Sequence, residues 1–305
     1  MTKSIVGIVG LGIMGGEMAE ALLREGYRVV GFDVASAAMQ RLVHAGGEAV
    51  PSAADVAGIA PVIVVSLATA AALAATVQSI ASTRQPGAAG ELVVIETSTL
   101  PLADKQAALE VCQAAGIVLL DCPISGTAAR MKDRAWTVYC SGQAAAVQQV
   151  EPLLRVFTDN VPNVGAFGNG TKMKFAANHL VAIYNVACAE SVTLVRKLGL
   201  DPQQVLDLFG TSAVLGTGVM RLRTPFMIKR EYLPATMKVE VWQKDMQVIG
   251  DMAKAVDCPT PLFSACVPIY TAAMAQGLAQ EDTASVNEVL GQMAGIPPRV
   301  AQDDA

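Results

Sequence analysis

A glycine-rich turn near the start of the chain constrains its fold more than any other feature. An apolar run over residues 4–9 leads into a turn with GxGxxG spacing, and residues 16–24 continue with a helical pattern. A strand, a glycine turn and a helix in this order suit a dinucleotide, because the glycines permit a tight turn, close backbone approach and close helix–strand packing. The pyrophosphate would lie at the helix N-terminus, where the N–H groups and the helix dipole favour negative charge. The residues expected to bind it are Gly10, Leu11, Gly12, Ile13, Met14 and Gly15.

An acidic residue follows these glycines at the expected separation. Asp33 closes a second apolar segment, residues 28–33, about twenty residues beyond the turn. Its carboxylate could accept hydrogen bonds from the adenosine ribose hydroxyls and would repel a 2′-phosphate. No arginine follows it directly, so the sequence favours NAD over NADP. The alternative is that Asp33 only caps the next helix.

Composition and charge exclude several classes of protein. The 305 residues suffice for two domains with a large core, and a net charge of −5 offers no basic field for nucleic acid. The two histidines exclude a histidine-rich metal centre. Six scattered cysteines without a CxxC pair indicate a reducing compartment, and the first strand is expected almost at Met1. We therefore expect a cytoplasmic protein with no signal peptide.

Residues 175–195 are the stretch most like a membrane span. They include Asn178, His179, Asn185 and Glu190, and polar groups of this kind are costly in lipid. A buried helix at a domain or subunit interface is the better interpretation. Because this long helix is apolar, we expect it to associate between subunits, as a homodimer or homotetramer.

The pattern of elements changes near residue 164. Before it, strands alternate with helices, which predicts an α/β, Rossmann-like, doubly wound parallel sheet over residues 1–164. After it, helical patterns dominate, which predicts an all-α substrate and oligomerisation domain over residues 165–305, entered through the long interdomain helix. Further strands are expected at 62–67, 92–96 and 117–121, with 137–140 and 160–164 extending the sheet. Helices are expected at 172–197, 202–209, 239–255, 261–276 and 284–293.

The start of the long helix carries a lysine and an asparagine one turn apart. Lys174 and Asn178 follow the glycines of residues 165–170 and share one face of the helix. A lysine at an apolar helix start can lose its proton when desolvated, and could then act as general base to an alcohol or general acid to a carbonyl. The alternative is an ordinary polar stripe.

A second polar loop follows the strand that ends at Asp121. Ligands bind at the carboxyl edge of an open parallel sheet, where this loop begins. The Ser125 hydroxyl and the N–H groups of Gly126 and Thr127 could hold a carboxylate. The same residues also suit an ordinary turn.

Together these motifs resemble those of the β-hydroxyacid dehydrogenase family, which includes 3-hydroxyisobutyrate dehydrogenase and tartronate semialdehyde reductase. The resemblance covers nearly the whole chain. The matching segments, in order, are Gly-Leu-Gly-Ile-Met-Gly at 10–15, Asp-Cys-Pro-Ile-Ser-Gly at 121–126, the glycine, lysine and asparagine pattern at 168–178, and Lys244-Asp245.

The resemblance implies a role for each matching residue. Lys174 would donate or accept the proton, Asn178 would hold the substrate, and Ser125, Gly126 and Thr127 would anchor its carboxylate. The residues implied to contact the cofactor beyond the glycine turn are Leu67, Thr99 and Lys244. The implied activity is NAD-dependent hydride transfer between the nicotinamide and a small hydroxy acid, with a semialdehyde or keto acid as product.

Two other functions are compatible with the same fold. Imine reductases of this scaffold generally carry another residue in place of the lysine, so Lys174 argues against that reading. A cofactor-binding sensor without turnover would not need the set of polar residues. Arg130 and Arg134 follow the substrate loop, and they either lie on a solvated turn or bind a second polar group of a larger acid.

Overall fold

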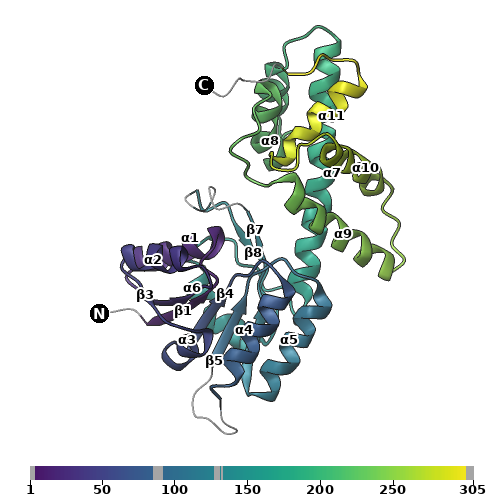
Figure 1. Cartoon of the computed structure of the whole chain (residues 1–305). Helices are drawn as coiled ribbons and strands as arrows, with labels where there is room; N and C mark the ends of the chain where they lie inside the picture. Colours follow the sequence, from purple (N-terminus) through teal and green to yellow (C-terminus); the bar gives the residue numbers. More distant parts are fainter. Residues whose placement is uncertain (1–3, 85–91, 127–130, 132, 300–305) are drawn as a thin grey trace. The chain divides into compact units, whose positions relative to one another are not determined.

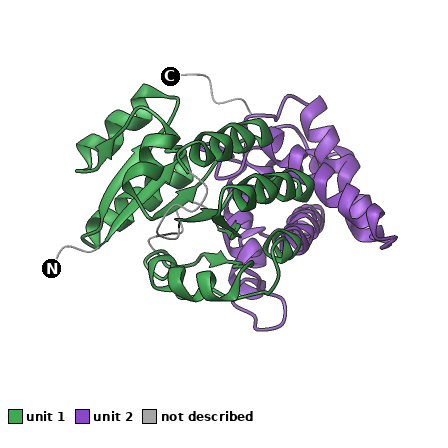
Figure 2. Cartoon of the chain, turned by 90° about the horizontal axis from the view of Figure 1, so that it is seen from below, with its two compact units in different colours: residues 1–174 green, residues 175–305 purple. Residues whose placement is uncertain are grey.

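The chain folds into two compact units in the computed structural model, which describes residues 4–84, 92–126, 131 and 133–299. One unit spans residues 1–174 and the other residues 175–305 (Figure 2). The helix α7 (Asn169–Lys197) contains the division between them. The domain boundary at residue 164 stays a prediction.

A six-stranded sheet forms the centre of the first unit. All its neighbouring strands pair in parallel, in the order β3-β2-β1-β4-β5-β6. The strands are β1 (Ile5–Val9), β2 (Arg28–Phe32), β3 (Glu48–Ala49), β4 (Val62–Val65), β5 (Leu92–Glu96) and β6 (Ile117–Asp121). Strand order reverses between β1 and β4, and the crevice at such a switch point is where open parallel sheets bind ligands.

Apolar side chains cover both faces of this sheet. Alternate residues of one strand belong to different clusters, with Val64 in one and Ile63 and Val65 in the other, as the pleat requires. Helices α1 (Ile13–Arg24), α2 (Ser36–His44) and α6 (Ala144–Leu154) contribute to the first cluster. Helices α3 (Ala53–Ile59), α4 (Ala70–Ala81) and α5 (Leu102–Ala114) contribute to the second (Figure 1). The predicted doubly wound α/β fold is confirmed.

The segments expected to extend the sheet form a small structure of their own, which an isolated bridge between Asp121 and Ser141 joins to the end of β6. Strands β7 (Ile124–Ser125) and β8 (Thr137–Val138) pair antiparallel as a two-stranded sheet. Isolated bridges then join Thr137 to Asn160 and Cys140 to Asn163. The prediction that 137–140 and 160–164 continue the large sheet was wrong, because these segments pair with each other and with the loop after β6.

Helices joined by loops make up the described part of the second unit. It contains most of α7, a π-helical turn η2 (Val205–Phe209), α8 (Gly218–Lys229), α9 (Val239–Ala255), α10 (Pro261–Ala275), a 3-10 turn η3 (Thr283–Ser285) and α11 (Val286–Met293). The helix expected at 202–209 is present from residue 203 to residue 209, and its last five residues form the π-helical turn. Helix α8 was not predicted from the sequence, because Arg221, Arg223 and Pro225 interrupt its apolar pattern. No helix among the described residues is long and apolar enough to cross a membrane.

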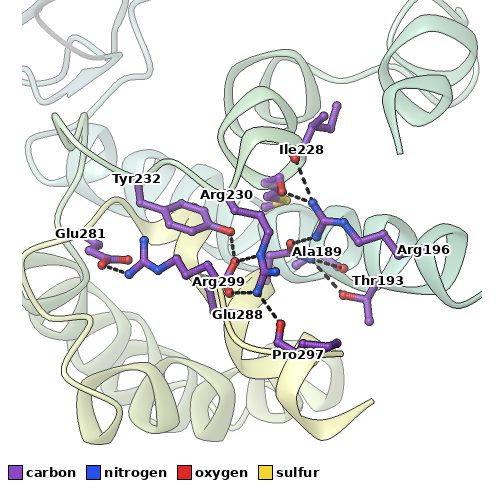
Figure 3. Close-up of polar contacts among 12 residues, drawn as sticks. Ala189, Thr193, Arg196, Ile228, Arg230, Tyr232, Glu281, Glu288, Pro297 and Arg299 are labelled. Carbon is purple, nitrogen blue, oxygen red and sulfur yellow. Dashed lines mark hydrogen bonds and ion pairs between the residues drawn. The ribbon is translucent and has the colours of Figure 1, made fainter. Parts of the chain in front are cut away.

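Paired charges fix the ends of several helices in this unit (Figure 3). Glu288 accepts hydrogen bonds from Arg230 Nε at 3.0 Å, Arg230 Nη2 at 2.5 Å and the Tyr232 hydroxyl at 2.7 Å. Arg196 donates to the carbonyls of Met227 and Ile228 at 2.6 and 3.0 Å, and so satisfies the C-terminal end of α8. The chain after α11 is held through contacts of Arg230 with the Pro297 carbonyl and of Arg299 with Glu281.

Candidate functional site

The three glycines of the first turn have three different structural roles. Gly10 has a φ of +89°, and a side chain there would overlap the Ser66 carbonyl oxygen. A side chain at Gly15 would overlap the Gly10 carbonyl, so this glycine allows α1 to pack against β1. A side chain at Gly12 would meet nothing within 4 Å. Packing therefore explains Gly10 and Gly15, whereas the open space at Gly12 leaves room for a ligand at the N-terminus of α1.

Asp33 joins this turn to the end of β2. Its Oδ2 accepts a hydrogen bond from the Leu11 N–H at 2.6 Å, and its Oδ1 accepts one from the Ala35 N–H at 2.8 Å. The second bond holds the residue that precedes α2 but is not a helix cap, because Ala35 is the N-cap residue and receives no side-chain cap bond. The first bond brings the carboxylate to the glycine turn, which a cap alone would not do. Each carboxylate oxygen has a further lone pair with which it can accept a ligand hydroxyl.

The loops after β4 and β5 are tied together beside the same edge. The Leu67 N–H donates to Ser98 Oγ at 2.8 Å, and the Ser98 N–H donates to Glu96 Oε1 at 2.8 Å. Thr99 directly follows and is partly exposed. The structure thus places the predicted cofactor residues of the first unit at the carboxyl ends of four strands, β1, β2, β4 and β5.

The first turn of α7 is anchored to the end of β6. The Asp121 carboxylate accepts from the Thr171 N–H at 2.8 Å and from Thr171 Oγ1 at 2.7 Å. Ser141 Oγ accepts from the Gly170 N–H at 3.0 Å and donates to the Asp121 carbonyl at 2.9 Å. Lys174 lies one turn further along this helix and is buried.

Gly170 shows that the close approach at this helix start is to the chain itself. A Cβ at Gly170 would lie 2.6 Å from the Asp121 carbonyl oxygen and 2.9 Å from Pro123 Cδ. The neighbour at Gly170 is the beginning of the predicted substrate loop, so Lys174 and that loop belong to one locally packed structure.

Sequence reasoning missed a buried cation in this region. Lys105 on α5 lies 2.6 Å from Glu96 Oε2 and 2.8 Å from Asp121 Oδ1, and all three side chains are fully buried. Burial alone would lower the pKa of Lys105, but the Glu96 and Asp121 carboxylates raise it above its ordinary value. Helical spacing could have indicated the burial of Lys105, because this residue falls in the same stripe of α5 as the buried Ala108 and Cys112.

The predicted substrate loop is described as far as Gly126. Ser125 is partly buried and pairs with Thr137, and Gly126 is exposed with a φ of +145°. A Cβ at Gly126 would overlap the ring of Trp136, which is 1% exposed. The loop therefore needs glycine at this position for its backbone and for the packing of Trp136. Thr127 and Arg130 lie outside the described residues.

The Arg134 side chain is bound by neighbouring residues of the first unit. Its guanidinium contacts both carboxylate oxygens of Asp159, at 3.0 and 2.7 Å, and donates to the Arg155 carbonyl at 2.8 Å. The adjacent Asp159 carboxylate raises the pKa of Arg134 through its hydrogen bond. These contacts support the interpretation of Arg134 as part of a surface turn.

In the helical unit, the two remaining predicted residues come from neighbouring helices. Asn178 on α7 donates from Nδ2 to Asp245 Oδ2 on α9 at 3.0 Å, and both side chains are buried. This bond fixes the orientation of the Asn178 amide. Lys244 precedes Asp245 and is exposed. The described residues contain no group of three or more His, Cys, Asp or Glu that could hold a metal ion.

Family models match almost the whole chain in two parts. Residues 5–165 match the NAD binding domain of 6-phosphogluconate dehydrogenase. Residues 168–290 match the NAD-binding domain of NADP-dependent 3-hydroxyisobutyrate dehydrogenase.

Individual proteins with the same organisation span the same length. An L-threonate dehydrogenase of Cupriavidus necator is 30% identical over 288 residues, covering 93% of this chain and 95% of its own. The crystal structure of a 3-hydroxyisobutyrate dehydrogenase from Salmonella typhimurium is 28% identical with a TM-score of 0.82, covering 94% of this chain and all of that one. An imine reductase from a Pseudomonas species has a TM-score of 0.64 at 19% identity, covering 94% and 99%, and shows a shared fold alone.

Proposed function

Because this chain belongs to the 3-hydroxyisobutyrate dehydrogenase-like family of NAD(P)-dependent hydroxyacid dehydrogenases, we propose that it oxidises a small hydroxy acid with NAD. Lys174 would accept the hydroxyl proton of the acid, and bound NAD would supply the acceptor for the hydride from the hydroxyl carbon. The products would be a semialdehyde or keto acid and NADH. The observation that carries this proposal is the anchoring of the Lys174 helix to Asp121, at the sheet edge where the glycine turn also lies.

The residues around the glycine turn fit a bound dinucleotide. When bound, NAD supplies the hydride acceptor, and the protein supplies orientation and a dry environment. The space at Gly12 and the N–H groups at the start of α1 would receive the pyrophosphate. Asp33 would accept hydrogen bonds from the adenosine ribose, and the exposed apolar side chains of Ile13 and Val34 would pack against the nucleoside.

Asp33 favours NAD over NADP in this proposal. Its carboxylate is fixed by the Leu11 N–H and would face a 2′-phosphate with a negative charge. The next two residues, Val34 and Ala35, offer no cation to compensate. NADP remains the alternative for the cofactor.

We assign the substrate to two groups of residues. Ser125, Gly126 and Thr127 would bind the carboxylate, with hydroxyl and N–H donors that suit an anion. Lys174 would hold and transfer the hydroxyl proton, and Asn178 would orient the substrate beside it. Lys244, an exposed residue of the helical unit, stays a candidate cofactor residue. A four-carbon sugar acid is the first substrate to test, since the Cupriavidus necator relative is an L-threonate dehydrogenase.

A panel of hydroxy acids tests the proposal. L-threonate, 3-hydroxyisobutyrate, glycerate and serine would be ranked by kcat/KM with NAD and with NADP, in wild type and in Asp33→Asn. We expect at least one acid to give NADH, with NAD preferred and the preference reduced in the variant. Tight NADH binding without turnover of any acid would favour a sensor, and reduction of cyclic imines in its place would favour the imine reductase alternative. Equal efficiency with NADP in the wild type would remove the role given to Asp33.

We also propose that the chain forms a homodimer or homotetramer through α7. One face of this helix repeats exposed apolar side chains at helical spacing, including Met173, Leu180, Tyr184 and Leu194. An apolar stripe of this length on a water-facing helix indicates a protein partner. Light scattering should give a dimeric or tetrameric mass at micromolar concentration, and a monomeric mass would contradict the assignment. The cytoplasmic location stays a prediction.

A further inference from the structure

Two carboxylates lie side by side on one face of the sheet in the first unit. Glu96 ends β5 and Asp121 ends β6, and the two residues are register partners in these parallel strands. Both side chains are fully buried. Neighbouring buried carboxylates repel each other and lose their hydration, so this pair requires a cation between them.

Lys105 supplies that cation from the crossover helix that joins the two strands. Its ammonium contacts one oxygen of each carboxylate, at 2.6 and 2.8 Å. The three charges still sum to −1, so further donors must satisfy the remaining oxygens. On the Asp121 side these donors include the N–H and hydroxyl of Thr171, at the positive end of the α7 dipole.

On the Glu96 side the donor is the backbone of the loop after β5. The Ser98 N–H donates to Glu96, and the Ser98 hydroxyl oxygen accepts from the Leu67 N–H. A continuous set of hydrogen bonds and ion pairs therefore runs from the loop after β4, through Ser98, Glu96, Lys105 and Asp121, to the first turn of α7. Its two ends are the loops after β4 and β5, which carry the predicted cofactor residues Leu67 and Thr99, and the helix that carries Lys174.

We propose that Lys105 is a positioning residue, which holds the Lys174 helix in register with the loops after β4 and β5 through Glu96 and Asp121. Thr171 precedes Lys174 by three residues, so the Asp121 bonds hold the same side of the helix one turn before the lysine. The inference rests on the proposed function, because it assigns these bonds a purpose in proton and hydride transfer.

Stability alone is a poor explanation for the buried charges. Replacing a buried ion pair by apolar residues of similar volume is often neutral or stabilising. Ion pairs and hydrogen bonds do, in contrast, fix the positions of the groups that they join. An error of about 1 Å in the placement of a reacting group can cost about 100-fold in rate.

Thr171→Val tests the inference with the least disturbance, since it removes one hydroxyl bond to Asp121 and no charge. Thr83→Val is the matched control, because the Thr83 hydroxyl bonds the Ile80 carbonyl at the end of α4. We expect Thr171→Val to lower kcat about tenfold and to shift the pH midpoint of kcat, with the Kd for NADH within about twofold of wild type. Thr171→Ser keeps the hydroxyl and should restore kcat, and Thr83→Val should change neither quantity.

Lys105→Met tests the cation itself. In folded protein we expect kcat to fall about 100-fold, and the double variant with Thr171→Val to fall no more than about twofold further, because both changes act through one set of bonds. If Lys105→Met does not fold, Thr171→Val and its serine rescue decide alone.

Two results would overturn the inference. The first is that Thr171→Val has the same kcat and the same pH midpoint of kcat as Thr83→Val. The second is that the kcat losses of Thr171→Val and Lys105→Met multiply in the double variant. Lys174→Ala is measured alongside. Turnover by Lys174→Ala at the wild-type rate would refute the proposed function. A Lys174→Ala protein with strongly reduced kcat, together with wild-type behaviour of Thr171→Val and Lys105→Met, would refute the positioning role only.

Discussion

Gly12→Ala should separate ligand binding from folding at the glycine turn. A methyl group at this position meets nothing within 4 Å, and the φ of Gly12, −64°, is open to any residue. The substitution should therefore leave the fold intact. It also restricts the unfolded chain, so the free energy of unfolding should stay constant or rise by about 0.4–1 kcal/mol.

The effect on cofactor binding should be large. In the proposed complex the pyrophosphate occupies the space that the new methyl group takes, and at least one N–H bond to a phosphate is lost. A hydrogen bond to a charged group contributes about 1.5–3 kcal/mol, so the Kd for NADH should rise about 10–100-fold. Titration of NADH fluorescence measures the Kd, and thermal unfolding without cofactor measures stability.

Two other alanine substitutions make the comparison specific. Gly58→Ala on α3 also adds a methyl group with nothing within 4 Å, and it should leave the Kd unchanged. Gly15→Ala places its methyl group against the Gly10 carbonyl, and it should lower the unfolding temperature before any ligand is added. A Gly12→Ala protein that binds NADH like wild type, or that unfolds as easily as Gly15→Ala, would refute the reasoning.

Two further predictions concern other parts of the chain. Burial raises the pKa of Glu288, but hydrogen bonds from Arg230 and Tyr232 outweigh burial and lower this pKa below its ordinary value. The ionised carboxylate therefore stabilises the fold above its unfolded pKa, and this stabilisation is lost as pH falls through its folded pKa. Glu288→Gln should thus lower the free energy of unfolding by about 1–2 kcal/mol at pH 7. In thermal melts below about pH 4 the stability difference between wild type and variant should shrink, and a difference that stays constant with pH would contradict the assignment. Gly126→Ala should lower both the unfolding temperature and kcat/KM for the acid, because its methyl group overlaps Trp136, and unchanged values of both would contradict the described loop.

The sequence predicted those features of the site that arise from local spacing. The glycine turn and Asp33 both follow from a strand–turn–helix–strand order, and the structure joins them through the Leu11 N–H. The placement of Ser125 after β6 follows from the same alternation. For these residues the distance along the chain determines position, because each lies at the carboxyl end of a parallel strand.

Contacts between residues far apart in the chain could not be predicted in this way. Thr171 meets Asp121 across 50 positions, and Asn178 meets Asp245 across 67. No local pattern in the sequence specifies which helix start meets which strand end. Lys105 was missed for a related reason. A lysine on a helix is usually exposed, and its burial here depends on two carboxylates from neighbouring strands that no local pattern places beside it.

The central claim is that the amine of Lys174 moves the hydroxyl proton, and Lys174→Ala tests it most directly. The variant should be compared with wild type for the Kd of NADH and for turnover of the best hydroxy acid across pH. The account predicts NADH binding within about threefold of wild type and a kcat lower by at least about 100-fold at every pH. Turnover at the wild-type rate with cofactor binding intact would contradict it.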